Sequence, residues 1–176
     1  MDVFTRERYK TIIIENLHYC IKNKGMIVYG YVIMSNHIHI IIQSAQARLS
    51  DLIRDFKKYS ARDIIRSIQT ETESRREWML ERFAKATSRH GRNSNYQFWK
   101  YGNHPEEIYT EKFLWSKLDY IHLNPVRSGI VEKASQYRYS SACNYVRGHG
   151  LLEVTLVDNP VIEVTQENRF WKSISW

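Results

Sequence analysis

The chain has 176 residues, of which 43% are hydrophobic, and this length and composition fit one domain with a substantial buried core. No stretch reaches the roughly 18 to 20 uninterrupted apolar residues of a membrane span. Met1 is followed by Asp2 and not by a basic and apolar signal peptide. We therefore expect no membrane partner.

The charge and the cysteines narrow the class of protein further. Lys and Arg number 26 against 19 Asp and Glu, so the net charge is +7, a modest excess that is compatible with a polyanionic partner. Cys20 and Cys143 lie far apart and form no CxxC motif, which argues against a disulfide and against a cysteine-based zinc site. A cytoplasmic protein is the expectation.

The first elements in chain order are a helix and a hairpin. Thr5 has the residue type of a helix cap, apolar side chains follow at helical spacing, and Gly25 is a stop signal. Residues 26–34 are almost continuously apolar, as in a strand that is buried on both faces. A Ser-Asn pair then predicts a tight turn into a second strand at residues 37–43, and the two strands make a hairpin.

The next elements are two helices, a loop and a strand. Residues 50–69 predict a helix, and the capping-box spacing from Thr70 to Glu73 predicts the start of another. Apolar residues of the second helix should face inward. They are Trp78, Met79 and Phe83. The composition of residues 88–95 indicates a loop, and residues 96–101, rich in aromatics, predict a strand.

His37 and His39 are separated by one residue in the second predicted strand. Side chains alternate along a strand, so both imidazoles should point to the same face of the sheet. Two imidazoles side by side are potential metal ligands. A His-x-His pair is a weak signal alone, because most such pairs are solvated or simply packed, and a metal site requires a third ligand.

A helix that follows the cap residue Thr110 carries Tyr120 and Asn124, and it should end at Asn124 because Pro125 disfavours helical geometry in the preceding residue. Tyr120 and Asn124 are four apart, so they share a helix face at the rim of the apolar stripe. A tyrosine hydroxyl, with a pKa near 10, is a poor nucleophile unless its target is activated, commonly by a metal that polarises a phosphate. This spacing alone does not bring the helix to the histidines.

Two segments carry a resemblance to a known family. Residues 34–42 (MSNHIHIII) and 117–127 (KLDYIHLNPVR) resemble the two signature blocks of HUH-type single-tyrosine transposases, in particular the REP-associated branch of these insertion-sequence transposases. Shorter stretches resemble that branch as well, in the same order. They are residues 54–58, 73–75, 103–105 and 137–142. The resemblance runs from about residue 3 to about residue 150.

The resemblance implies an α+β fold: a ferredoxin-like antiparallel sheet with helices packed on one face. It implies a metal-dependent endonuclease and strand transferase that cleaves and rejoins single-stranded DNA at hairpin ends, with Mg²⁺ or Mn²⁺. His37 and His39 match the paired histidine ligands, and Tyr120 matches the nucleophile that forms a 5′-phosphotyrosine link and frees a 3′-OH. Asn124 matches the third ligand, often glutamine in relatives; its carbonyl suits a hard cation. A homodimer is compatible with the resemblance.

A basic stripe, defined as Arg54, Lys58, Arg62 and Arg66, follows one side of the helix predicted at residues 50–69. On an isolated helix such a stripe is more often a solvated face. The resemblance and the net charge favour a DNA-binding surface instead, to which Lys100 is added. Aromatic residues flank Lys100 and could stack on bases, although core packing is expected of most of them. They are Tyr96, Trp99 and Tyr101.

The family has a strand ahead of the segment that matches residues 3–6, and here the chain begins at Met1. The expected sheet therefore lacks its first strand or replaces it, and residues 151–157 have strand character that suits pairing within the sheet or across a dimer. We expect a transposase domain at residues 1–150 and a C-terminal strand and tail at residues 151–176.

Two alternatives to the strand transferase stay open at this point. The first is a catalytically inactive, hairpin-binding remnant of a transposase, which the missing strand favours. The second is a hydrolase that uses His37 and His39 to bind zinc; it lacks an obvious catalytic Glu or Asp nearby and ranks last.

Overall fold

The computed structural model describes residues 1–87, 95–100 and 105–158, which form two compact units. The first unit comprises Met1–Leu49 and Glu106–Trp176, and the second comprises Ser50–Pro105. Tyr101, the 103–104 part of one family stretch and most of the expected loop at residues 88–95 lie outside the described residues.

The first unit contains a two-stranded sheet and the helices that pack beside it. Its elements are η1 (Val3–Thr5), α1 (Glu7–Lys24), β1 (Met26–Ile33), β2 (Ile38–Ser44), α4 (Glu111–Arg127), η2 (Ala134–Gln136) and α5 (Ala142–Arg147). The second unit contains α3 (Arg76–Thr87) and, apart from its first residue, α2 (Leu49–Thr70). Helices beside a reduced antiparallel sheet confirm the α+β class.

Helix α1 ends where the sequence predicts and begins one residue later than predicted. Gly25 adopts a left-handed conformation with φ 67°, and its N–H donates to the carbonyl of Cys20, which closes the last turn. The predicted cap was wrong, because Thr5 lies in η1 and Arg6 holds the capping position. Tyr9, Ile13 and Leu17 are each fully buried along the inner face of α1.

Strands β1 and β2 form the predicted antiparallel hairpin, with Val32 opposite His39. The register shifts between Val28 and Gly30, which is a bulge in β1. The N–H of Met34 donates to the carbonyl of His37 over 2.9 Å, and this bond closes the turn ahead of β2.

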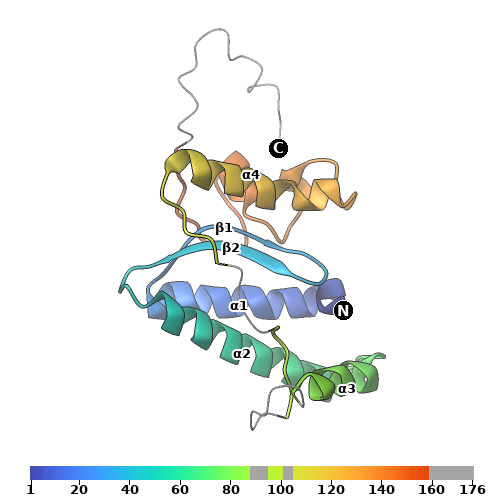
Figure 1. The fold of residues 1–176 in the computed structure, drawn as a ribbon. Coiled ribbons are helices and arrows are strands. Elements are labelled where there is room, and N and C mark those ends of the chain that lie inside the picture. The colour runs from blue at the N-terminus through green and yellow to red at the C-terminus, as the bar shows by residue number, and fades with distance from the viewer. Residues whose placement is uncertain (88–94, 101–104, 159–176) are drawn as a thin grey trace. The chain divides into compact units, whose positions relative to one another are not determined.

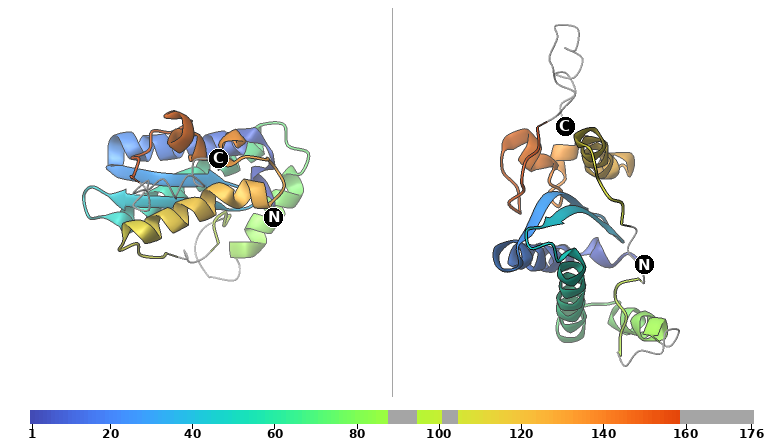
Figure 2. Two further views of the ribbon diagram at one scale, coloured as in Figure 1. Left: turned by 90° about the horizontal axis from the view of Figure 1, so that it is seen from above. Right: turned by 60° about the vertical axis from the view of Figure 1, so that its left-hand side comes forward.

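Helices α1 and α4 cover opposite faces of the hairpin, as the views in Figures 1 and 2 agree. Helices were expected on one face only. The difference follows from β1, which is apolar on both faces and buries Val28, Tyr31 and Val32 completely or nearly so. Gly30 allows α4 to approach closely, because a Cβ there would lie 2.5 Å from the Cδ2 atom of Leu118.

The outer edge of β1 is covered by later parts of the chain. The N–H of Ile33 donates to the carbonyl of Tyr139, and that of Ser141 donates to the carbonyl of Tyr31, each over 2.9 Å. The N–H of Thr155 donates to the carbonyl of Val28 over 2.8 Å. Residues 151–157 thus contact β1, but they form no strand.

Helix α4 begins as predicted and ends three residues later. The Thr110 side chain accepts a hydrogen bond from the N–H of Phe113. The helix continues through Pro125 to Arg127, where the N–H of Ser128 donates to the carbonyl of Asn124. Pro125 removes one hydrogen bond near the C-terminal end of the helix, and its ring is fully buried, so packing offsets that loss.

In the second unit, α2 matches its predicted range closely and α3 does not. Helix α2 runs to Thr70, and α3 begins only at Arg76, after the buried Glu73 carboxylate accepts a hydrogen bond from the N–H of Arg75. Trp78 is 43% exposed and does not face inward. Residues 95–100 form no strand, so the predicted strand was wrong for residues 96–100.

Candidate active site

The hairpin places the two histidines on one side of the sheet. The ring centroids of His37 and His39 lie 4.9 Å apart at an interplanar angle of 78°. His37 comes directly before β2 and His39 is its second residue, so strand alternation explains why the rings share a face. The two imidazoles are therefore close enough to act on one ligand.

Tyr120 projects from α4 toward the histidines. Its ring centroid lies 5.5 Å from that of His39, with the rings edge to face at 78°. Leu118 and Ile121 on the same helix are buried, whereas Tyr120 is 46% exposed. The core contacts of α4 thus fix the helix while the tyrosine stays open to a substrate, which is the rim position that the spacing predicts.

Asn124 lies one turn after Tyr120, and one hydrogen bond orients its side-chain amide. The Nδ2 atom of Asn124 donates to the carbonyl of Tyr120 over 3.0 Å. This bond uses a donor and leaves the amide oxygen available as an acceptor or metal ligand. Asn124 is thereby placed on the tyrosine's side of α4.

The two imidazoles are held in the form that binds metals. Burial lowers the pKa of His37, and burial followed by the charge of His37 lowers the pKa of His39. Nδ1 of His37 lies 2.6 Å from Oδ1 of Asn36. An amide oxygen only accepts hydrogen bonds, so Nδ1 carries the proton and Nε2 keeps its lone pair for a ligand.

The donor set that these residues offer is two imidazole nitrogens and one amide oxygen. Among the described residues, no group of three or more His, Cys, Asp and Glu side chains is arranged to hold a metal ion. Beside the two imidazoles, an amide oxygen of the kind that Asn124 carries would be a suitable third donor. Such a mixed set suits Mn²⁺ or Mg²⁺ with water completing the coordination.

Arg127 is a neighbour of Tyr120 to which sequence reasoning assigned no role. Its guanidinium carbon lies 5.6 Å from the centroid of the Tyr120 ring. Burial raises the pKa of the nearby Asp119 carboxyl, and the charge of Arg127 acts in the opposite direction. Arg127 follows Tyr120 by seven residues, or two helical turns, and this spacing is the sequence signal that could have pointed to it. The guanidinium of Arg127 supplies positive charge beside the tyrosine.

His122 was also missed, and it lies on the buried side of α4. Only 2% of the residue is exposed, and its Nε2 atom lies 2.8 Å from Oγ of Ser141. Burial lowers the pKa of His122 to about 4. The imidazole is therefore neutral in the folded protein at neutral pH.

The depressed pKa predicts that acid destabilises the first unit. The unfolded chain binds a proton at His122 near pH 6.5 and the folded chain only near pH 4, so the free energy of unfolding falls as the pH drops through this window. The contribution of His122 reaches about 3 kcal/mol at the acid end, from ~1.4 kcal/mol per pKa unit. His37 and His39 add to the trend, so denaturant unfolding at pH 4.5 and pH 7 should be compared with that of His122→Gln. An equal loss of stability in both proteins would contradict the prediction.

The basic stripe is exposed on α2 but partly neutralised within the helix. The side chains of Arg54, Arg62 and Arg66 are 67%, 61% and 69% exposed. Arg54 pairs with Asp51 over 2.7 Å, and Arg62 and Arg66 lie 3.0 and 3.5 Å from Asp63. Lys58 is also exposed, 5.8 Å above the ring of Tyr59.

Lys100 is exposed at the end of an irregular segment whose aromatic residues at positions 96, 98 and 99 are half-buried. Nε1 of Trp99 donates to Oγ of Ser60 over 3.1 Å, and the Trp99 ring lies 6.2 Å from that of Phe56. Trp99 therefore packs within the second unit and is not a free stacking platform for bases.

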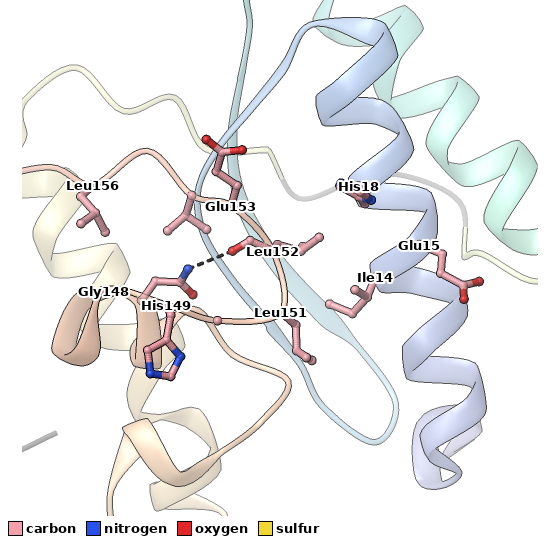
Figure 3. Close-up of a pocket in the computed structure, with 12 residues that line it drawn as sticks. Ile14, Glu15, His18, Gly148, His149, Leu151, Leu152, Glu153 and Leu156 are labelled. Atoms are coloured by element: carbon pink, nitrogen blue, oxygen red, sulfur yellow. Dashed lines mark hydrogen bonds between the residues drawn. The ribbon is translucent and has the colours of Figure 1, made fainter.

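A cavity of about 420 Å³ lies elsewhere in the first unit, between α1 and residues 148–156 (Figure 3). Its wall includes Asn144, whose Nδ2 atom donates to the carbonyl of Leu152 over 2.9 Å. None of the site residues predicted from the sequence is among the residues that line the cavity. His37, His39 and Tyr120 therefore lie outside this cavity.

The candidate site can be compared with known proteins. The sequence profile of the family described as "Transposase IS200 like" matches residues 1–121, which is more than half of the chain and includes His37, His39 and Tyr120. No curated protein and no solved structure gives a significant match. In the described part of the chain, no helix is long and apolar enough to cross a membrane. The chain belongs to the family of IS200-like transposases.

Proposed function

We propose that this transposase cleaves and rejoins single-stranded DNA at hairpin ends through a covalent bond to Tyr120. The observation that carries the proposal is the 5.5 Å separation between the ring centroids of Tyr120 and His39. This short distance would place the nucleophile on α4 beside the ligand pair on the hairpin. Both side chains belong to one chain, so a second copy is not required to bring them together. A homodimer and membership in the REP-associated branch stay as predictions from the resemblance.

The proposed reaction exchanges one phosphodiester for another. The hydroxyl oxygen of Tyr120 attacks the phosphorus, the bond to the 3′-oxygen of the upstream strand breaks, and the phenol proton passes to solvent while the leaving oxygen takes up a proton as a 3′-OH. The downstream strand stays on the enzyme as a 5′-phosphotyrosine. Attack by a 3′-OH on that phosphorus reverses the step and rejoins strands with no loss of bond energy.

The side chains have separate roles in this scheme. His37, His39 and the amide oxygen of Asn124 would hold Mg²⁺ or Mn²⁺, and the cation supplies positive charge to a phosphate oxygen when bound. The neutral imidazoles and the hydrogen bonds at Asn36 and Tyr120 fit this role. Arg127 adds positive charge where the attacking oxygen and the phosphate meet.

The experiment that tests the proposal uses the complete chain and a hairpin oligonucleotide labelled at one end. Incubation with Mn²⁺ should transfer the 3′ label to the protein band in denaturing gels, whereas a 5′-labelled oligonucleotide should release a free fragment with a 3′-OH. EDTA should prevent both. Binding without any adduct would support the inactive remnant, and zinc-dependent hydrolysis without an adduct would support the hydrolase.

We propose that the basic stripe on α2 contacts the DNA backbone. If each side chain neutralises a phosphate, the binding constant should fall with salt at a log-log slope of about −0.7 per contact for single strands. Arg54→Ala combined with Arg66→Ala should then flatten the slope by about 1.4 and weaken binding to all sequences about equally. Filter binding at several salt concentrations measures this.

The matched control for the stripe removes two exposed basic side chains of the first unit, Lys22 and Arg147, and so changes the net charge by the same amount. If the slope changes equally in both double variants, the net charge of the protein alone determines the salt dependence of DNA binding, and the position of the stripe has no effect. An unchanged slope in the stripe variant would mean that Arg54 and Arg66 do not contact the DNA and only pair with aspartates of their own helix.

A further inference from the structure

A buried polar junction joins α4 to β1 on the side of the helix away from Tyr120. The Oγ atom of Ser141 accepts the N–H of Tyr31 over 2.8 Å, lies 3.3 Å from the carbonyl of Tyr31, and lies 2.8 Å from Nε2 of His122. Ser141 is fully buried and His122 nearly so. One hydroxyl thus meets the backbone of the strand and the side chain of the helix that carries the candidate nucleophile.

The hydrogen bonds at this junction are complete in either arrangement of the protons. If the hydroxyl of Ser141 donates to the carbonyl of Tyr31, a protonated Nε2 of His122 donates to Oγ. If the hydroxyl donates to Nε2 instead, His122 is the acceptor. A hydrocarbon at position 122 could take neither role.

The contact between α4 and β1 is otherwise apolar, and this junction supplies its directional hydrogen bonds. Leu118 and Ile121 pack over Gly30, where a Cβ would lie 2.5 and 3.1 Å from their side chains. Apolar packing sets how closely α4 approaches the sheet, but the hydrophobic effect that drives this packing is non-directional. A buried hydrogen bond with a fixed partner on the strand defines that register.

The register matters because the candidate site is divided between the two elements. Tyr120 and Asn124 come from α4, whereas His37 and His39 come from the hairpin to which Tyr31 belongs. His122 is two residues from Tyr120, about 200° around the helix, so a rotation that frees His122 swings Tyr120 relative to His39.

We infer that His122 is a positioning residue: through Ser141 it holds α4 in the register that brings Tyr120 to the histidine pair. The inference rests on the proposed function, because it takes Tyr120 as the attacking group. His122 does not touch the reacting atoms.

The test compares His122→Gln, which can keep a hydrogen-bonding atom near the position of Nε2, with His122→Leu, which cannot. His122→Leu and Ser141→Ala should each lower the single-turnover rate of adduct formation by about 10- to 100-fold, the usual effect of a misplacement near 1 Å. The dissociation constant for DNA should stay within about twofold. The double variant should be no slower than the worse single variant, since the two residues act through one bond.

A second readout does not depend on activity. The 5.5 Å edge-to-face arrangement of His39 and Tyr120 should give a nuclear Overhauser effect between their ring protons in the metal-free protein. His122→Gln should keep this signal and an adduct rate within about threefold of the wild type. His122→Leu and Ser141→Ala should lose the signal while the remaining spectrum stays that of a folded protein.

The outcomes separate the inference from the proposed function. If His122→Leu keeps the wild-type rate and signal, or if His122→Gln is as impaired as His122→Leu, the inference is wrong. If the wild-type protein gives the ring signal but no adduct, the proposed function fails and the signal alone decides the role of His122. Should His122→Leu not fold, Ser141→Ala and His122→Gln decide in its place. His18→Leu, an exposed histidine on α1, is the control and should change neither readout.

Discussion

Replacing Tyr120 with phenylalanine should abolish covalent attachment to DNA and leave DNA binding nearly intact. The change removes the attacking oxygen, so adduct formation should fall by at least about a thousandfold, as for other nucleophile deletions. The ring itself stays, and with it the edge contact to His39 and the position beneath Arg127. The rate of adduct formation on a 3′-labelled hairpin oligonucleotide and the dissociation constant for the same DNA measure the two effects.

Tyr109→Phe is the matched control, because Tyr109 lies just before α4 and is 81% exposed. It should form the adduct at the wild-type rate. The chain has 12 tyrosines, so undiminished adduct formation by Tyr120→Phe would mean that another of them is the nucleophile.

Removal of the His39 imidazole should weaken metal binding and stop the reaction together. His39→Ala deletes one of three proposed ligands, and Mn²⁺ affinity in isothermal titration should fall by at least about tenfold, since even residues that only support a ligand cost 10- to 100-fold. Adduct formation at a fixed Mn²⁺ concentration should fall with it. His37→Ala should behave in the same way.

Substitutions of Asn124 distinguish its oxygen from its packing. Asn124→Asp supplies a carboxylate oxygen and should bind Mn²⁺ at least as tightly, whereas Asn124→Leu has no donor and should bind it more weakly. His18→Ala, on the exposed side of α1, should leave the affinity unchanged. If the affinity of His39→Ala equals that of the wild type, the metal site lies elsewhere.

Local sequence patterns predicted the elements that carry the site. The apolar run of β1, the turn before His37 and the helix-stop at Gly25 are signals that neighbouring residues determine, and the structure follows them. The predicted end of α4 at Asn124 was wrong, because the burial of Pro125 outweighs the local preference against helical geometry at Asn124. Over the described residues 96–100, the expected strand is absent for a related reason: Trp99 packs on Phe56, and the segment forms no ladder of backbone hydrogen bonds.

The site itself was predictable only within each element. Strand alternation places His37 and His39 side by side, and helical spacing places Tyr120 beside Asn124. The approach of α4 to the hairpin depends on tertiary contacts between residues far apart in sequence, above all Gly30 with Leu118 and Ser141 with His122. A lone histidine on the apolar side of a helix carries no sequence signal that identifies such a partner.

The most direct test of the central claim is to locate the covalent bond. The complete chain is incubated with a hairpin oligonucleotide and Mn²⁺, the adduct is digested with trypsin and a nuclease, and the modified peptide is sequenced by mass spectrometry. The 5′-phosphate should be attached to Tyr120, in the peptide that follows Lys117. A nucleotide on a different side chain, or cleaved DNA with no modified peptide at any stage of the reaction, would contradict the claim.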